Sequence, residues 1–149
     1  MKPIIGEIVI AAPIEAVFDF VADETNEPLY NPRMVQVEKL TPGPVGLGTR
    51  YAAVMKGRRR SRVTIECTGF NRPRSLKSHS RTAGLDITGG LTFAPQGNHC
   101  RLRWVWRLEP HGPLRLLGPL VRAVGNRREQ ATWMALKEYL ELRQPAGQV

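Results

Sequence analysis

Alternating apolar and polar side chains predict β-strands along most of the chain, because successive side chains of a strand point to opposite faces. The strongest alternation lies at 100–109, where apolar residues at even positions are separated mainly by charged ones. Similar patterns predict six further strands, at 4–10, 34–40, 50–56, 62–68, 73–81 and 85–93. Gly89 and Gly90 interrupt the last of these and predict a bulge or bend there.

A helical repeat replaces the alternation after Pro113 and predicts one long helix ending near Leu142. Its apolar stripe consists of Leu117, Leu120, Val121, Val124, Ala131, Ala135, Tyr139 and Leu142, widened by Trp133, Leu136 and Leu140. Gly118-Pro119 falls inside the repeat, where a proline removes a helical hydrogen bond, so we expect a kink or restart there. Arg128 lies within the stripe and needs a partner or water.

Two short helices are predicted between the first two strands. Pro13 suits an early helical position. The apolar residues that follow it at helical spacing are Ile14, Val17, Phe18 and Val21. Asp23 is a candidate cap for the second helix, which runs through Pro28-Leu29 and ends before Pro32, because the residue preceding a proline avoids helical angles.

The order of elements is therefore one strand, two short helices, six strands and one long helix. Short turns between successive strands favour an antiparallel meander. The strands have one apolar face, so the sheet needs cover on one side only, and the long helix is the one predicted element large enough to supply it. The expected fold class is α+β, with a curved antiparallel sheet of about seven strands wrapped around the C-terminal helix and a space between them.

The length of 149 residues suits a single domain. We expect an ordered core at about 3–142 and a tail at 143–149. No apolar run reaches the roughly 18–20 residues that a membrane span requires. The apolar N-terminal segment is interrupted by Gly6 and Glu7, so a first strand explains it better than a signal peptide.

The two cysteines, Cys67 and Cys100, lack the spacing of a CxxC motif and fall on apolar strand faces. This favours reduced thiols in the core of a cytoplasmic protein. A single disulfide between neighbouring strands is the alternative.

Three segments carry a resemblance to one superfamily. They are Ile10-x-Ala12-Pro13-x-Glu15-x-Val17-Phe18-x-Phe20-x-Ala22-Asp23, Tyr30-Asn31-Pro32 and Gly43-Pro44-x-Gly46-x-Gly48-Thr49-Arg50. The chain resembles the START/Bet v 1-like (SRPBCC) superfamily, and within it the polyketide cyclase/dehydrase and lipid transport group. The resemblance covers nearly the whole chain and implies a helix-grip fold that binds lipids, sterols, polyketides, quinones or other apolar molecules between helix and sheet. Only some members are enzymes, and Tyr30 stands where Trp is more usual before Asn-Pro.

The resemblance implies that inward-facing residues line a mostly apolar cavity, the usual form of a small-molecule site. The candidate ligand-binding residues are Tyr51, Met55, Ile65, Leu76, Ser78, Trp104 and Trp106 from the strands, and Val121, Val124, Arg128, Ala131 and Ala135 from the helix. Arg128, with Ser78, Ser80 and Tyr51, offers donors for a carboxylate, phosphate or carbonyl oxygen. The alternatives are that the apolar residues only fill a core, and that Arg128 pairs with a glutamate or extends to the cavity mouth.

Catalytic residues are harder to identify. His79, His99 and His111 fall on an outward strand face, in a turn and in the loop before the long helix, and the sequence places none beside an acidic partner. His111, near the expected cavity entrance, and Tyr51 are the catalytic candidates. Metal-ligand spacing, a nucleophile elbow and a phosphate-binding glycine loop are missing from the sequence, so we expect neither a metal nor a cofactor.

The net charge of +9 is unusual, and arginine supplies 17 of the 22 basic residues. Such a charge favours anionic partners. The outward basic residues are Arg58, Arg59, Arg60, Arg62, Lys77, Arg81, Arg101, Arg103 and Arg107. They suit an anionic membrane surface or simple solvation; nucleic acid is disfavoured, because Trp104 and Trp106 face the other way and leave no stacking platform.

Three functions remain open. The favoured one is binding or transport of a hydrophobic or amphipathic small molecule, lipid, polyketide or quinone-like. The second is a polyketide cyclase/aromatase or dehydratase, in which Arg128, Tyr51 or His111 polarises a carbonyl or moves a proton. The third is an adaptor that binds anionic membrane or RNA through the arginine-rich face. The sequence leaves the ligand and the oligomeric state open.

Overall fold

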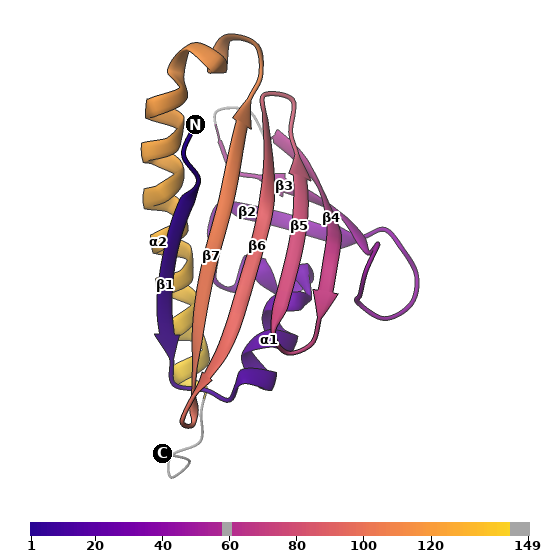
Figure 1. Ribbon diagram of the computed structural model, residues 1–149. Coiled ribbons are helices and arrows are strands. Elements are labelled where there is room, and N and C mark those ends of the chain that lie inside the picture. Colours follow the sequence, from indigo (N-terminus) through magenta and orange to yellow (C-terminus); the bar gives the residue numbers. More distant parts are fainter. Residues whose placement is uncertain (58–60, 144–149) are drawn as a thin grey trace.

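The computed structural model describes residues 1–57 and 61–143 (Figure 1). Its elements in order are β1 (Ile4–Ile10), α1 (Ile14–Ala22), the 3-10 helix η1 (Glu24–Leu29), β2 (Met34–Lys39), β3 (Arg50–Met55), β4 (Ser61–Asn71), β5 (Ser75–Arg81), β6 (Leu85–Gln96), β7 (His99–Pro110), the 3-10 helix η2 (Gly112–Leu117) and α2 (Gly118–Leu142). The predicted arginine turn at 58–60 and the tail beyond residue 143 lie outside the described residues.

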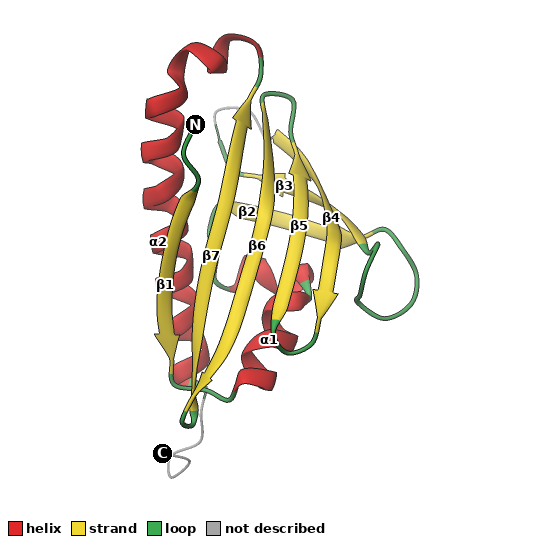
Figure 2. Cartoon of the chain, viewed as in Figure 1, coloured by secondary structure: helices red, strands yellow, loops and turns green. Residues whose placement is uncertain are grey.

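All seven strands form one antiparallel sheet in the order β1-β7-β6-β5-β4-β3-β2. The sheet is a meander from β2 to β7, and β1 joins it beside β7. Strands β2 and β3 run across the direction of β6 and β7, so the sheet curves around its helix-bearing face (Figure 2). The predicted α+β helix-grip fold with seven strands and a long C-terminal helix is confirmed.

Of the bulge or bend predicted at Gly89 and Gly90, the bulge is wrong, because β6 keeps a continuous register with both neighbours through these residues. The glycines serve close strand packing instead. A Cβ on Gly89 would lie 2.0 Å from the carbonyl oxygen of Val105, and one on Gly90 would lie 2.2 Å from that of Leu76. Register shifts occur at Met34/Gln36 in β2 and Cys67/Gly69 in β4.

Local sequence signals explain the first helices. The face of α1 that contacts β6 and β7 carries the predicted apolar residues Ile14, Val17, Phe18 and Val21. Asp23 caps η1 as predicted, since its carboxylate accepts a hydrogen bond from the backbone N–H of Thr25 at 3.0 Å. The 3-10 helix η1 then packs against β2. This placement brings the acidic residues of η1 beneath the sheet.

The long helix restarts at Gly118, as the Gly-Pro pair predicted, with η2 preceding it. It packs on β1 and β7 along one edge of the sheet (Figure 1). Contact with these strands is close because Gly125 faces them, and a Cβ there would lie 3.0 Å from Ile4 Cδ1 and 3.2 Å from Leu108 Cδ1. The sheet curves away from α2 beyond this edge.

The predicted apolar face of α2 is buried only in part: Trp133, Leu136 and Leu140 are buried as predicted, and Ala135 and Tyr139 pack against the core. Leu117, Leu120, Val124, Ala131 and Leu142 are exposed. The buried residues are Gly118, Trp133, Leu136 and Leu140, with Gly125 and Glu129 partly covered between them. The stripe was misplaced because hydrophobic periodicity gives no weight to glycine and glutamate, which here occupy the inward positions of the first four turns.

Two clusters of buried side chains make up the core. The larger joins α1, α2, β1, β6 and β7. The smaller contains Met34, Tyr51, Ala53, Val63 and Ile65 at the β2–β4 end of the sheet. Cys67 and Cys100 are free thiols, so the predicted reduced state agrees with the structure and the alternative disulfide does not. Among the described helices, none is both long and apolar enough to cross a membrane.

Candidate functional site

A cavity of about 380 Å³ lies between the middle of α2, η1 and the curved sheet. It exists because α2 packs on β1 and β7 while strands β3 to β6 curve away from it. Its apolar wall comprises Val21, Ala22, Met34, Met55, Val63, Ile65, Leu76, Leu85, Ile87 and Leu91. Its size and mixed lining are typical of a small-molecule site.

The strands supply the cavity residues that their alternation predicted. Tyr51, Met55, Ile65, Leu76, Ser78 and Trp106 all line the cavity, and so do the further inward candidates Val63, Ser80, Leu85 and Ile87. Trp104 does not. It is buried in the core, where its ring stacks on Trp133 with centroids 5.9 Å apart.

The helix supplies a different set from the predicted one. Arg128 lines the cavity, together with Glu129, Thr132 and Trp133. The other helix candidates lie elsewhere: Val124 and Ala131 are exposed, Val121 is half-buried outside the cavity, and Ala135 packs against the core. These four positions are corrected because the helix is rotated about its axis relative to the predicted stripe.

Glu129 is partly buried, with its carboxylate between two tryptophans. Its Oε2 accepts hydrogen bonds from Nε1 of Trp133 at 2.7 Å and from Nε1 of Trp106 at 2.9 Å. Burial raises the pKa of the Glu129 carboxyl, and the two indole donors oppose the rise. These bonds hold an acceptor oxygen at the junction of α2 and β7.

Two further carboxyls reach the cavity from η1. Burial raises the pKa of Glu27 to about 7; a hydrogen bond from Nδ2 of Asn31 at 3.2 Å opposes the rise and the nearby Glu129 adds to it. Burial and the charges of Glu27, Asp23 and Glu129 raise the pKa of Glu24 well above its ordinary value. The two carboxyls of η1 therefore hold their protons to a higher pH than exposed glutamates do.

Sequence reasoning missed all three glutamates. Glu24 and Glu27 follow a helix cap, where acidic residues are common on exposed first turns. The only local signal was their spacing of three residues beside the buried Tyr30-Asn31 pair. Glu24 and Glu27 lie near the N-terminus and Glu129 lies near the C-terminus, so no local sequence pattern predicts that they approach one another.

The cavity also carries basic residues. Arg33, Lys56, Lys77 and Arg128 contribute to its lining, and the last is largely exposed. Burial of part of the side chain and the charge of Arg33 lower the pKa of Arg128. Within the described ranges, Arg128 forms no ion pair with a carboxylate. The predicted pairing with a glutamate is therefore absent there, and Arg128 lies beside another cation.

Tyr51 differs from the other polar residues of the wall. Its side chain is 1% exposed, and the described residues offer the hydroxyl proton no acceptor. Burial, reinforced by the charge of Asp23, raises the pKa of Tyr51 to about 12, and a hydrogen bond with the backbone of Glu24 opposes the rise. Tyr51 thus offers a free donor to the cavity.

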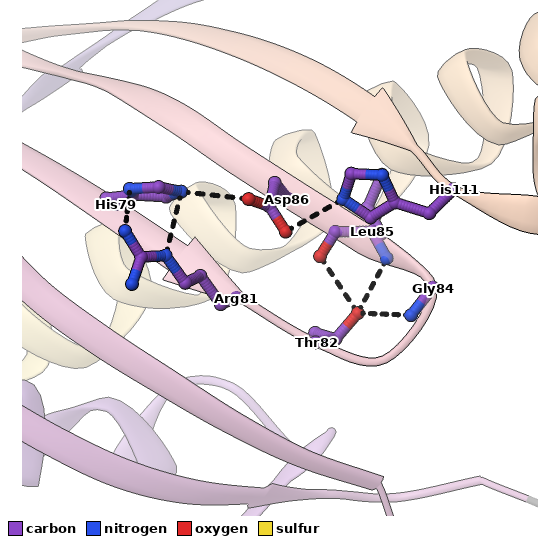
Figure 3. A network of polar contacts seen from close by, with 7 residues as sticks. All are labelled: His79, Arg81, Thr82, Gly84, Leu85, Asp86 and His111. Atoms are coloured by element: carbon purple, nitrogen blue, oxygen red, sulfur yellow. Dashed lines mark hydrogen bonds and ion pairs between the residues drawn. The ribbon is translucent and has the colours of Figure 1, made fainter.

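His111, the other catalytic candidate, is not part of the cavity lining. It lies on the outer side of the sheet, where Asp86 bridges two histidines (Figure 3). The carboxylate is 3.0 Å from Nε2 of His111 and 3.1 Å from Nε2 of His79. The sequence placed no histidine beside an acidic partner, and the fold supplies one, because strand pairing brings β5, β6 and the end of β7 together.

The Asp86 cluster has a structural role in this setting. Hydrogen bonds from His111 and His79 lower the pKa of Asp86. In the adjoining turn, the Thr82 hydroxyl accepts from the backbone N–H of Leu85 at 2.9 Å and donates to its carbonyl oxygen at 2.9 Å. Together these bonds stabilise the β5–β6 hairpin and fasten the loop that leads to η2 (Figure 3).

The predicted basic outer face is exposed in the structure. Its described members are Arg62, Lys77, Arg81, Arg101, Arg103 and Arg107. Arg103 has a long ion pair with Glu7 at 3.6 Å, and both side chains are more than half exposed. An anionic membrane partner for this face stays a prediction.

Comparison with known proteins places the cavity in context. A family model described as "Polyketide cyclase / dehydrase and lipid transport" matches residues 4–141. No curated protein sequence matches the chain.

Solved structures share the whole fold at low sequence identity. A START superfamily protein from Mycobacterium smegmatis has a TM-score of 0.84 and 14% identity, covering 97% of this chain and 100% of its own. The Zhui aromatase/cyclase from Streptomyces sp. R1128 has a TM-score of 0.84 and 15% identity, covering 99% of both chains. A protein from Thermus thermophilus has a TM-score of 0.78 and 20% identity, covering 96% of this chain and 100% of its own.

Proposed function

The chain belongs to the polyketide cyclase / dehydrase and lipid transport family, and from this premise we propose that it binds or transports a hydrophobic or amphipathic small molecule in the cavity under α2. The family and its structural neighbours confirm the resemblance to the START/Bet v 1-like superfamily. The lipid, polyketide or quinone-like character of the ligand is part of the proposal.

The observation that carries this proposal is the cavity itself. It has about 380 Å³ of space, a wall of apolar side chains and a limited set of polar groups. Apolar surface facing such a space gains from contact with an apolar ligand, since this removes both from water. Arg128, an exposed residue of the cavity lining, is the proposed anchor for a polar head of the ligand.

Two neighbouring positions on α2 test this proposal. Thr132 lines the cavity and Ala131 is exposed. Thr132→Trp should fill the space and weaken binding of the neutral fluorescent probe N-phenyl-1-naphthylamine about tenfold or more, since overpacking costs about 1–3 kcal/mol. Ala131→Trp adds the same side chain outside the cavity and should leave the affinity unchanged.

Thermal unfolding of both variants checks that the fold is kept. Equal binding by both variants and wild type would place the apolar site elsewhere. Native mass spectrometry of freshly purified protein, followed by solvent extraction, then identifies a ligand that accompanies the wild type. The same adduct should be depleted in Thr132→Trp.

A cyclase or dehydratase is the second candidate, and one observation favours it. The carboxyl of Glu27 has a pKa of about 7 in the cavity, which suits a group that accepts and returns a proton near neutral pH. Glu27 takes the role that His111 was predicted to fill. With a poly-β-ketone mimic as substrate, Glu27→Gln should abolish turnover and preserve binding, whereas His111→Gln should preserve both. Unchanged turnover in Glu27→Gln would remove this candidate.

A further inference from the structure

One side of α2 is apolar and exposed. The helix packs on β1 and β7, and its opposite side lies at the edge of the molecule with no described element over it (Figure 1). Large apolar side chains gather there: Leu116 of η2 is 88% exposed, Leu120 is 58% exposed and Leu117 is 48% exposed. Val124 continues the row one turn further along α2. Exposed apolar residues grouped in this way, unlike single ones, mark a surface that contacts a partner.

Cations border this apolar row. Arg115 precedes it on η2, Arg127 and Arg128 follow it on α2, and all three side chains are exposed. None of the three forms an ion pair among the described residues. The sequence from 110 to 128 contains no acidic residue, and the carboxylate of Glu129, which follows, is held by two tryptophans. We call the apolar row and its three arginines the helix patch.

The outer face of the sheet differs from the helix patch in the signs of its charges. On the sheet, arginines stand among carboxylates: Arg103 pairs with Glu7 at 3.6 Å, and Glu109 follows Arg107 on the same face of β7. The helix patch instead combines apolar side chains with charge of one sign. This combination is typical of a helix that lies in the interface of a lipid bilayer.

We propose that the helix patch docks the protein on an anionic membrane surface, with α2 lying along the lipid interface. Leu116, Leu117 and Leu120 enter the boundary between headgroups and acyl chains, where apolar side chains leave water. Arg115 and Arg127 lie level with the phosphates, which attract cations and accept their hydrogen bonds. The net charge of +9 favours the approach to such a surface.

A second copy of the chain does not complement this surface. A two-fold dimer pairs a patch with itself. If the two copies of α2 run antiparallel, Arg115 approaches Arg127 of the other copy, and if they run parallel, each arginine approaches its own counterpart. Like charges brought together in this way oppose association. Lipid phosphates supply the negative charge that a second helix patch lacks.

Docking on the helix patch places the cavity next to the lipid. Arg128 belongs both to the patch and to the cavity lining. An apolar ligand would then pass between membrane and cavity with little exposure to water. The docking contacts do not involve the ligand, so this inference goes beyond the proposed binding function. Thr132→Trp, which fills the cavity, should bind vesicles as wild type does.

Vesicle flotation tests the docking. Wild type should float with vesicles made of phosphatidylcholine and phosphatidylglycerol in equal amounts, and much less with vesicles of phosphatidylcholine alone. The double variant Leu116→Ser with Leu120→Ser should weaken the partition about tenfold or more, because two leucines no longer leave water. Arg127→Gln should weaken it about fivefold on the anionic vesicles. Added salt should also weaken it, since ions screen the attraction.

Matched changes elsewhere serve as controls. Leu47→Ser removes a leucine that is 74% exposed in the loop between β2 and β3, and Arg101→Gln removes a cation from the outer face of the sheet. Both variants should float as wild type does. Thermal unfolding should show that all variants keep the fold, because the altered side chains are exposed. Brominated lipid should quench the added fluorescence of Leu120→Trp and leave that of Leu47→Trp unchanged.

The outcomes separate docking from binding in the cavity. Loss of flotation confined to the helix-patch variants, with quenching at position 120, supports the inference. Wild type that floats with neither vesicle overturns it, as do equal losses in patch and control variants. If wild type fails to float and the double serine variant converts an oligomer into a monomer in light scattering, the patch is a subunit interface instead. None of these results depends on whether the cavity binds N-phenyl-1-naphthylamine.

Discussion

Individual polar residues, more than apolar ones, distinguish this cavity from an ordinary core. Glu24, Glu27 and Glu129 bring three carboxyls to a space with apolar walls, and Tyr51 adds a hydroxyl donor for which residues 1–57 and 61–143 provide no acceptor. Such groups reduce stability, because burial without full pairing costs free energy. Their presence indicates that the space has a use beyond packing.

Glu27 gives a prediction about stability and pH. Its pKa in the folded protein is about 7, above the ordinary value of 4.5, so the folded state holds an extra proton between these pH values. The associated stability is fully present below about pH 4.5 and is lost as the pH rises through 7. From pH 5 to pH 8, wild type should lose about 1–3 kcal/mol of unfolding free energy relative to Glu27→Gln.

Urea denaturation at a series of pH values measures this difference. Glu38→Gln, which alters an exposed residue of β2, is the control and should follow wild type. Parallel pH curves for wild type and Glu27→Gln would contradict the raised pKa. Because the charge of Glu27 helps to raise the pKa of Glu24, the difference between wild type and Glu27→Gln includes this coupling.

At the scale of elements, the placement of α2 determines the cavity. The helix contacts β1 and β7 closely at Gly125 and does not follow the sheet as it curves toward β3. Its middle turns present Arg128, Glu129, Thr132 and Trp133 to the space that remains. The rotation of the helix about its own axis therefore selects which residues meet a ligand.

Gly125 tests this packing. Gly125→Leu would place a branched side chain against Ile4 and Leu108, so we expect a loss of about 2–3 kcal/mol in unfolding free energy and a displaced helix. Ala123→Leu makes a similar addition on the exposed side of α2 and should change stability by about 0.5 kcal/mol or less. Denaturant titration of the two variants provides the comparison, and equal stability would contradict the close contact.

At the scale of the whole molecule, the cavity separates two hydrophobic clusters of unequal size. The larger is covered by α1 and α2, whereas the smaller, at the β2–β4 end, contains five buried residues. Both clusters contribute to the cavity lining. A ligand in the cavity would therefore contact both hydrophobic clusters and link them.

Amide hydrogen exchange should detect the contact of a bound ligand with both clusters. With N-phenyl-1-naphthylamine at 100 times its dissociation constant, binding adds about 2.7 kcal/mol of stability. We expect amide protection to rise more in β3 and β4 than in β1 and β7. The reason is that β3 and β4 would contact the rest of the core by way of the bound ligand. Thr132→Trp should show no such gain, and a uniform gain across the sheet would contradict two separate clusters.

The sequence by itself determined the types and order of the elements and the inward face of the sheet. Both follow from local rules: a period of two places Tyr51, Ile65, Leu76 and Ser78 on one face, and a proline after glycine restarts the helix. Tertiary structure decided the rotation of α2 and the meeting of Glu24 and Glu27 with Glu129. A glycine can be recognised as an inward helix position only from the strand that packs against it. A charged residue can be recognised as part of a cavity only from the distant segments that surround it in the fold.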